Sequence, residues 1–139
     1  MVDSTVWSLA FRRRPGAPLN PSELAVREAL AGLVRAHTAM LIGPVRQEVL
    51  SGIREHSAFL RLREAMRAFP DEVIVAEDFE QAAEFANTCR ATGVLASHID
   101  FLVCSVAARL DVTVFSLDPD FARIVQHVPV RLHPLSASA

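Results

Sequence analysis

Val112-Thr-Val-Phe-Ser-Leu-Asp-Pro-Asp-Phe121 is the stretch from which the fold of this chain is best read. Its first part, Val112–Ser116, has the β-branched and aromatic composition of a short buried strand. A helical pattern follows over Pro119–Val125, and Asp118 stands at the junction. Because open parallel sheets bind ligands outside the carboxyl ends of their strands, an acidic residue at such a junction is a candidate ligand-binding group.

Three further acidic residues occupy similar junctions. Asp3 directly follows the first short apolar run, and Glu48 lies on the first turns of the helix expected after Ala39–Ile42. Asp100 opens a helix, where the backbone N–H groups favour a carboxylate. Several carboxylates at strand ends suit a hard divalent cation, and such a cation with water is the equipment for phosphodiester hydrolysis. The four carboxylates meet only if their strands are neighbours, which the sequence does not show.

Each acid also has an ordinary structural interpretation. An aspartate at a strand–helix junction often caps the helix, which applies to Asp3 and Asp118. Glu48 alone would be a solvated charge, and Asp120 is either a supporting ligand or a cap. Asp100 is harder to explain in this way, because its neighbours are apolar and a bare carboxylate among them would be costly.

The remaining periodicity predicts an α/β chain: a mostly parallel sheet with helices on both faces. Asn20, Pro21 and Glu23 predict an N-cap, a first helical residue and a capping-box partner, and Asp78 with Gln81 predicts a second capping box. The predicted strands are 1–4, 39–42, 72–75, 112–116 and 130–132, and the predicted helices are 5–13, 21–37, 43–52, 56–69, 78–93, 100–110 and 119–125.

Length and composition favour one domain over residues 1–139, with no transmembrane span and no secretory signal, and hence a cytoplasmic protein. We expect Cys89 and Cys104 to be reduced core thiols. The formal charge of −2 gives no basic footprint for nucleic acid, although all 14 basic residues are arginine, the better bidentate phosphate ligand. Genomic base composition explains an all-arginine chain equally well.

In their order and spacing, four segments resemble the PIN domain family, and within it the VapC-type toxin ribonucleases of toxin–antitoxin pairs. These segments are Val2–Trp7, Val45–Gly52, Gly93–Ala107 and Val112–Phe121. The resemblance implies a three-layer α/β/α PIN-like fold with a five-stranded, mostly parallel sheet. It departs from the usual pattern in having only two residues before Asp3 and in having serine at 116, where threonine is commoner.

The resemblance carries the acidic quartet onto Asp3, Glu48, Asp100 and Asp118, with Asp120 close by. It implies an endoribonuclease that uses Mg²⁺, or Mn²⁺ in its place, and cleaves a few structured tRNA or rRNA sites. The expected metal ligands are Asp3, Asp100 and Asp118. Glu48 binds a second metal or acts as a general base through water. Ser4 and Ser116 match small hydroxyl positions that support the site.

Substrate RNA and protein partners complete these expectations. An acidic centre needs cations at its rim, and the RNA-contact candidates are Arg12, Arg13, Arg14, Arg46 and His98. An ordinary solvated basic face is the alternative. The resemblance also implies a small antitoxin that blocks the active site and a homodimer, for which the apolar face Phe59, Leu60, Leu62 and Met66 could supply surface unless it is buried in the core.

Three other functions stay open on the sequence. The first is a PIN-fold nuclease of RNA processing, without an antitoxin. The second is a non-catalytic metal- or phosphate-binding α/β module similar to response-regulator receivers, although receivers need a lysine near the site and this chain has none. The third is a purely structural interaction domain, in which neutralising Asp100 would change neither activity nor metal binding.

Overall fold

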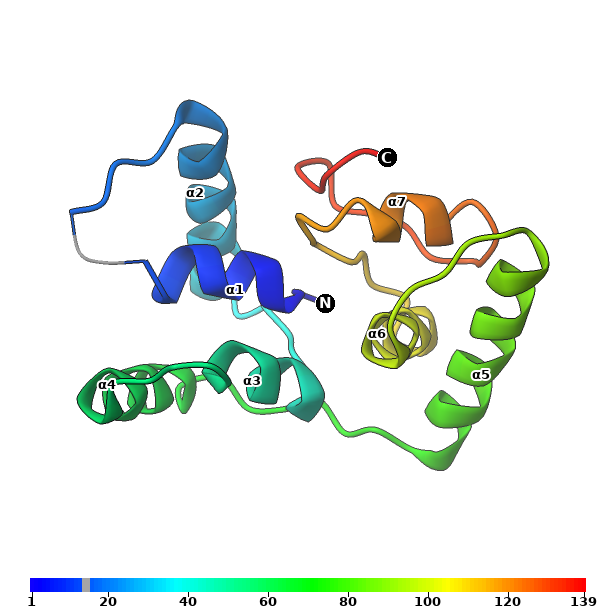
Figure 1. The fold of residues 1–139 in the computed structure, drawn as a ribbon, viewed down its shortest axis with the longest axis horizontal. Coiled ribbons are helices and arrows are strands. Elements are labelled where there is room, and N and C mark those ends of the chain that lie inside the picture. Colours follow the sequence, from blue (N-terminus) through cyan, green and yellow to red (C-terminus); the bar gives the residue numbers. More distant parts are fainter. Residues whose placement is uncertain (14–15) are drawn as a thin grey trace. The chain divides into compact units, whose positions relative to one another are not determined.

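The computed structural model describes residues 1–13 and 16–139, and seven helices form in this part of the chain (Figure 1). The helices are α1 (Ser4–Phe11), α2 (Pro21–Arg35), α3 (Gly43–Leu50), α4 (His56–Met66), α5 (Ala76–Ala91), α6 (His98–Arg109) and α7 (Asp120–Ile124). The chain divides into two compact units. The N-terminal unit is Val2–Glu72, and the C-terminal unit is Val73–Ala139 together with Met1. A single domain over 1–139 stays a prediction.

The predicted five-stranded parallel sheet, and with it the three-layer α/β/α arrangement, is wrong for the described residues. Their pairing is limited to isolated bridges, among them the parallel bridges of Leu41 with Asp71 in the N-terminal unit and Val114 with Leu132 in the C-terminal unit. A single backbone hydrogen bond, from the Val2 amide to the Met40 carbonyl at 2.8 Å, joins the start of the chain to the segment that contains Leu41. The architecture is therefore helical, with extended segments that touch but form no ladder.

The strand predictions fail because the extended segments are too short to build a ladder. Each predicted strand has three to five residues, and helix-start or proline signals interrupt it on at least one side. The commonest strand length in globular proteins is about 5–6 residues. The segment 72–75 illustrates this, since Val73 is strongly exposed and helix α5 begins directly after Val75.

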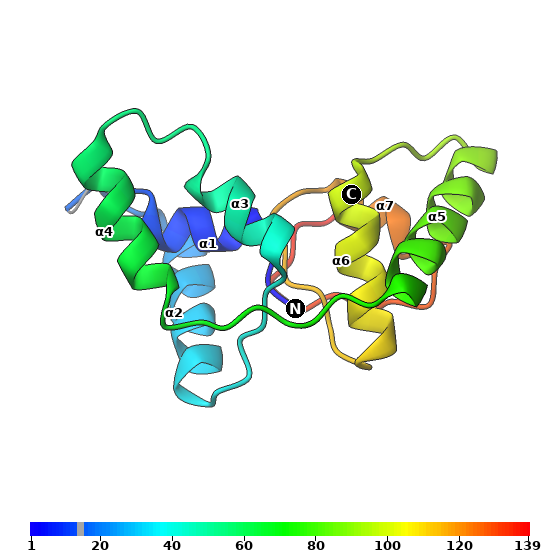
Figure 2. The ribbon, with the colours of Figure 1, turned by 90° about the horizontal axis from the view of Figure 1, so that it is seen from below.

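In the N-terminal unit, α1 packs against α2 and α3, and α3 packs against α4 (Figures 1 and 2). The centre of this packing is Trp7, which is fully buried and whose ring lies 4.8 Å from that of Phe69 and 5.9 Å from that of Phe11. Its indole N–H donates to the Val2 carbonyl at 3.2 Å, so the polar edge of the ring is satisfied as the ring is buried.

The start of α2 confirms the predicted capping box. The Asn20 side chain accepts from the Glu23 amide at 2.8 Å, and the Glu23 carboxylate accepts from the Asn20 amide at 3.0 Å. Pro21 takes the first helical position, where its missing N–H costs nothing. The helix ends at Arg35, two residues earlier than predicted, because His37 adopts a left-handed conformation with φ of 56°.

The face of α4 that was considered for a homodimer is divided by burial. Leu62 and Met66 belong to the core, whereas Phe59 is half-buried and Leu60 is exposed. The helix also stops at Met66, three residues before the predicted end, with Pro70 following shortly. The core therefore accounts for half of the proposed face.

In the C-terminal unit, α5 and α6 lie side by side and make the most extensive helix–helix packing in the described residues. Helix α5 begins at Ala76, so the prediction of Asp78 as its N-cap is wrong: Val75 is the N-cap and Asp78 is the third helical residue. The Asp78 carboxylate reaches back to the Val75 amide at 2.9 Å. At the other end Gly93 takes the predicted left-handed position with φ of 82°.

Helix α6 is buried over the seven consecutive residues Phe101–Ala107. Such a run cannot show one-sided amphipathic periodicity, which explains why its start was placed two residues late, at Asp100 in place of His98. Cys104 lies in this run, and Cys89 faces inward from α5; both cysteines are buried and neither forms a disulfide, as predicted. Burial raises the pKa of the Cys89 thiol.

Candidate active-site carboxylates

Asp3 is a buried carboxylate at the N-cap of α1, with 3% of its surface exposed. One of its oxygens accepts from the Thr5 hydroxyl at 2.8 Å and from the Thr5 amide at 3.3 Å, and the Ser4 hydroxyl donates to the other at 3.4 Å. A buried charge needs such donors, and the cap supplies them. The capping interpretation of Asp3 is thus confirmed, and it fixes where the carboxylate points.

Glu48 lies on α3, whose neighbours in the unit include α1, the helix that Asp3 caps. Its side chain is half-buried between the core residues Val45 and Val49. In the part of the chain that the structure describes, the Glu48 carboxylate accepts no hydrogen bond and forms no ion pair. A half-buried carboxylate without a donor retains its full capacity to accept from water or to bind a cation.

Asp100 is the third residue of α6 and completes a capping box. Its carboxylate accepts from the Ser97 amide at 2.8 Å, while the Ser97 hydroxyl accepts from the Asp100 amide at 3.1 Å. The carboxylate thus lies at the positive end of the helix dipole. This interaction offsets part of the free-energy cost of placing a charged group among apolar side chains. This box explains structurally the residue that was hardest to explain from sequence.

Asp118 belongs to a loop organised by buried hydroxyl groups. Its amide donates to the hydroxyl of Ser116 at 3.0 Å, and its carboxylate accepts from the amide of Asp120 at 2.9 Å. Ser116 is fully buried, and its own amide donates to the Ser136 hydroxyl at 3.2 Å. Asp120 begins α7 and forms an ion pair with Arg123.

Two supporting residues were missed by the sequence argument. Thr5 holds the Asp3 carboxylate through both its amide and its hydroxyl, and a hydroxyl residue two positions after an aspartate could have indicated this. Ser136 lies 20 residues from Ser116, donates its own hydroxyl to the Val114 carbonyl at 3.2 Å, and is connected by no local pattern.

The acids are thus shared between the two units. Asp3 and Glu48 belong to the N-terminal unit, while Asp100, Asp118 and Asp120 belong to the C-terminal unit. Among residues 1–13 and 16–139, no group of three or more His, Cys, Asp or Glu side chains is arranged to hold a metal ion. The chemistry of the donors nevertheless fits a hard divalent cation, because every one is a carboxylate oxygen.

The basic candidates differ in what they already bind. Arg12 is exposed at the end of α1, and its guanidinium has no partner within the described residues. Arg13 forms an ion pair with Glu23 and donates to the Pro18 carbonyl at 3.1 Å. Arg14 lies outside the described residues. His98 is exposed at the first position of α6.

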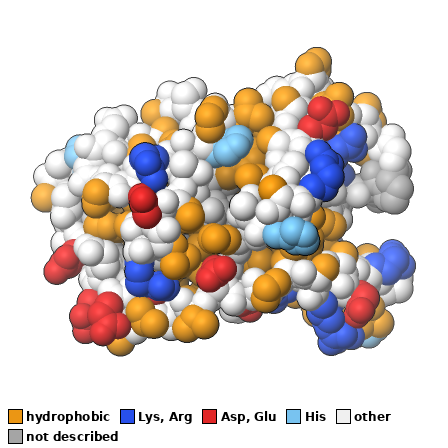
Figure 3. All heavy atoms as spheres, turned by 180° about the vertical axis from the view of Figure 1, so that it is seen from behind, with side chains coloured by type: hydrophobic (Ala, Val, Ile, Leu, Met, Phe, Trp, Pro, Cys, Tyr) orange, Lys and Arg blue, Asp and Glu red, His pale blue; other side chains and the backbone are white. Residues whose placement is uncertain are grey.

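Arg46 is occupied by its own unit. Its guanidinium donates to the Asp71 carboxylate at 2.8 Å, to the Met66 carbonyl at 2.7 Å and to the Phe69 carbonyl. It thereby satisfies carbonyls left over at the end of α4, and it has little capacity left for a phosphate. Charged side chains of both signs are interspersed with hydrophobic ones on the face drawn in Figure 3.

Carboxylate oxygens are the ligands that hard divalent cations such as Mg²⁺ prefer, and such cations assist the hydrolysis of phosphate esters. The sequence matches the family model of the PIN domain over residues 1–126. The chain therefore belongs to the PIN domain family, as the resemblance predicted, and PIN domains are generally metal-dependent nucleases. No described helix is both long enough and apolar enough to cross a membrane.

Proposed function

We propose that this PIN domain is the toxin of a toxin–antitoxin pair, a Mg²⁺-dependent endoribonuclease that acts in the cytoplasm on a narrow set of structured RNAs. The observation that carries the nuclease assignment is the match to the PIN family, with acidic residues at all four expected positions. The toxin role rests on the sequence resemblance of four segments, taken in their order and spacing.

In this proposal each carboxylate has a stated role. Asp3, Asp100 and Asp118 hold the cation, and Asp120 supports them. When bound, Mg²⁺ or Mn²⁺ polarises the scissile phosphate and lowers the pKa of water. Glu48 takes the proton of the attacking water or binds a second cation, roles that suit a half-buried carboxylate with no protein donor in the described residues.

The hydroxyl groups around the acids have a positioning role. The Thr5 hydroxyl fixes one Asp3 oxygen, and Ser4 donates to the other. Ser116 orders the loop that carries Asp118. Such partners reduce the freedom of a ligand before a cation binds, which raises the affinity without adding charge.

Substrate and partner complete the proposal. Arg12 is the basic residue best suited to contact RNA, because it is exposed and unpaired within the described residues. His98 is a second candidate, and Arg13 would first have to leave Glu23. An antitoxin would restrain the nuclease by blocking the carboxylates, and the toxin itself would be a homodimer.

The test is incubation of purified protein, freed of any antitoxin, with total cellular RNA and Mg²⁺ or Mn²⁺, followed by sequencing of new 5′-phosphate ends. Asp3→Asn is the decisive variant, because asparagine caps a helix as well as aspartate does and the fold is retained. We expect discrete metal-dependent ends that fall by at least about a hundredfold in this variant, as when a transition-state contact is lost.

The matched control is Asp111→Asn, which removes the same charge from an exposed residue paired with Arg131. Asparagine also tolerates the left-handed conformation of this position, φ 52°. Cleavage that survives EDTA, or that is equal in Asp3→Asn and Asp111→Asn, would overturn the assignment. Cleavage without any neutralising antitoxin encoded beside the gene would favour a nuclease of RNA processing.

A further inference from the structure

An apolar hollow of about 460 Å³ lies between α5 and the first turns of α6, within the C-terminal unit. From α5 it is lined by Phe79, Ala83 and Ala86, and from α6 by Ile99 and Leu102. Small alanine side chains on one wall leave space that the neighbouring helix does not fill. The hollow is therefore large enough to accept a large side chain from outside.

A large apolar side chain is exposed beside this hollow. Phe79 has 57% of its surface exposed, although an aromatic ring gains most from burial. Phe79, Ala83, Ala86 and Arg90 recur at helical spacing and form one stripe along α5. The same stripe thus carries both a projecting ring and the small residues that could receive one.

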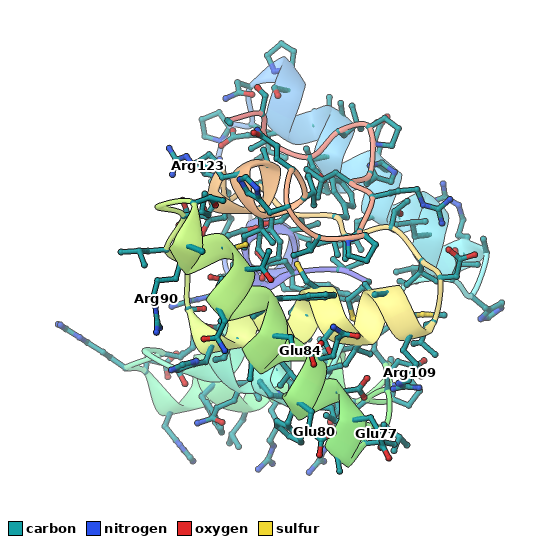
Figure 4. All side chains as sticks on the ribbon, turned by 90° about the vertical axis from the view of Figure 1, so that its right-hand side faces the viewer. Glu77, Glu80, Glu84, Arg90, Arg109 and Arg123 are labelled. Atoms are coloured by element: carbon teal, nitrogen blue, oxygen red, sulfur yellow. The ribbon has the colours of Figure 1, made fainter. Side chains whose placement is uncertain are left out.

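Charge is distributed unevenly along α5. Glu77 and Glu80 project from its first half and Glu84 from just past its middle, and Arg90, in the last turn, is the only basic residue of the helix (Figure 4). Within the described residues the side chains of Arg90 and His98, which rim the hollow, form no hydrogen bond or ion pair. The helix thus presents a negative first half and an unpaired positive end.

We propose that α5 and this hollow form the homodimer interface, with the α5 helices of two copies packed antiparallel across a two-fold axis. The stripe is centred between residues 84 and 85, so Ala83 faces the partner's Ala86 and the backbones approach closely. Phe79 enters the partner's hollow beside the partner's Arg90, and the contact is repeated by symmetry. Arg90 also comes within reach of the partner's Glu80.

The direction follows from charge. Antiparallel packing places each positive helix end against a negative first half and also opposes the helix dipoles, whereas parallel packing would place like charges together. A guanidinium over the face of Phe79 adds a cation–π contact. A second copy is favoured over an unrelated partner because the projecting ring, its receiving hollow and both charges occur on one surface.

This inference specifies the homodimer of the proposed function, but it is tested without RNA. The full chain is examined by sedimentation velocity and light scattering over a range of concentrations. We expect the wild type to have twice the mass of the chain and Phe79→Asp to raise the dissociation constant at least about tenfold, as for an aromatic anchor. Val73→Asp, a change at an exposed residue three positions before α5, is the matched control.

Charge reversal and cross-linking identify the surface. We expect Arg90→Glu and Glu80→Arg each to weaken the dimer and their combination to restore it. A short bismaleimide should join two copies of Ala86→Cys but not of Gln81→Cys, which lies on another side of α5, while the buried native thiols stay unreactive.

A wild type that is monomeric at all concentrations would overturn the inference. A dimer that Phe79→Asp leaves intact, or that Ala86→Cys does not cross-link, would place the interface elsewhere and equally reject the α5 surface. A monomer whose hollow binds an amphipathic peptide would show a different occupant. None of these results depends on nuclease activity, so the proposed nuclease function stands or falls separately, whereas a monomeric wild type would also reject the proposed homodimer.

Discussion

Each unit contains an arginine–aspartate pair in which one side chain is more buried than the other, but the more buried partner differs between the units. In the N-terminal unit the guanidinium of Arg46 is the more buried, with 21% of its side chain exposed against 40% for Asp71. In the C-terminal unit the carboxylate of Asp78 is almost fully buried at 2%, against 37% for Arg109. The acidic side chain is therefore the more exposed partner in the N-terminal unit, and the basic side chain is the more exposed partner in the C-terminal unit.

Which partner is buried determines what happens to each pair when one side chain is removed. The Arg109 fork donates to both oxygens of Asp78, at 2.8 and 2.9 Å, and to the Val73 carbonyl at 2.8 Å, joining α6 to the start of α5. Because only 2% of the Asp78 side chain is exposed, removing Arg109 leaves a buried charge without its counter-charge. Asp71 faces water already, and Arg46 relies mainly on carbonyl groups of α4 and the loop that follows.

The largest effect is expected for Arg109→Ala. The Asp78 carboxylate would keep its Val75 amide donor but lose its counter-charge, and breaking such a pair costs about 3–5 kcal/mol. Urea unfolding monitored by circular dichroism measures the loss. Arg131→Ala, which removes an arginine of the same unit whose ion pair with Asp111 is exposed to water, is the control and should change stability by less than about 1 kcal/mol. Equal losses in the two variants would contradict this account.

A smaller loss is expected for Arg46→Ala. Its three hydrogen bonds disappear, but the Asp71 carboxylate and the carbonyls near the end of α4 can turn to water. We expect a decrease of about 1–2 kcal/mol in the free energy of unfolding. Hydrogen exchange should show the change in the last turn of α4, with α5 and α6 unaffected. A cost as large as that of Arg109→Ala would show that burial of the carboxylate does not decide the difference.

The Arg109–Asp78 pair should make the stability of the protein depend on pH in the acidic range. The hydrogen bonds from Arg109 are the main cause that lowers the pKa of Asp78. A lowered folded-state pKa stabilises the protein above the unfolded value, here about pH 4, and this stability is lost as the pH falls further. Unfolding free energies measured from pH 5 to pH 2.5 should fall less steeply in Arg109→Ala than in the wild type. Identical slopes would contradict the assignment.

The smallest effect is expected for Asp71→Asn. The carboxylate is substantially exposed, and an exposed ion pair contributes about 0–1 kcal/mol. We therefore expect a change in stability below about 0.5 kcal/mol, measured by urea unfolding beside the wild type. A larger loss would mean that Asp71 fixes Arg46 before the carbonyl contacts form.

Local chemistry predicted much of the helical structure. The capping box of Asn20, the start at Gly43 and the left-handed Gly93 follow from residues within one turn of the feature itself. The start of α5 was misplaced because Asp78 can cap a helix as its N-cap or as its third residue. In the second arrangement Asp78 also binds Arg109, a contact 31 positions away that no local pattern predicts.

The strands and the site were predicted less completely, because both depend on long-range pairing. The sequence of an apolar run such as Val112–Ser116 does not show how many of its residues form backbone hydrogen bonds with another segment. In the structure, its pairing with Leu132 is an isolated bridge at Val114. At the site, the family assignment is confirmed, while the four acidic positions stay a prediction from the sequence. Their partners Ser97 and Thr5 are local, whereas Ser136 approaches Ser116 only when the C-terminal segment folds back.

The two buried cysteines allow local opening of the C-terminal unit to be measured by thiol labelling. A thiol reagent reaches Cys89 or Cys104 only when α5 or α6 opens, because both sulfurs are enclosed in the folded chain. The raised pKa of Cys89 further slows its reaction in the closed state, since the thiolate is the reactive form. The labelling rate of the unmodified protein therefore measures how often these helices separate, with no engineered probe.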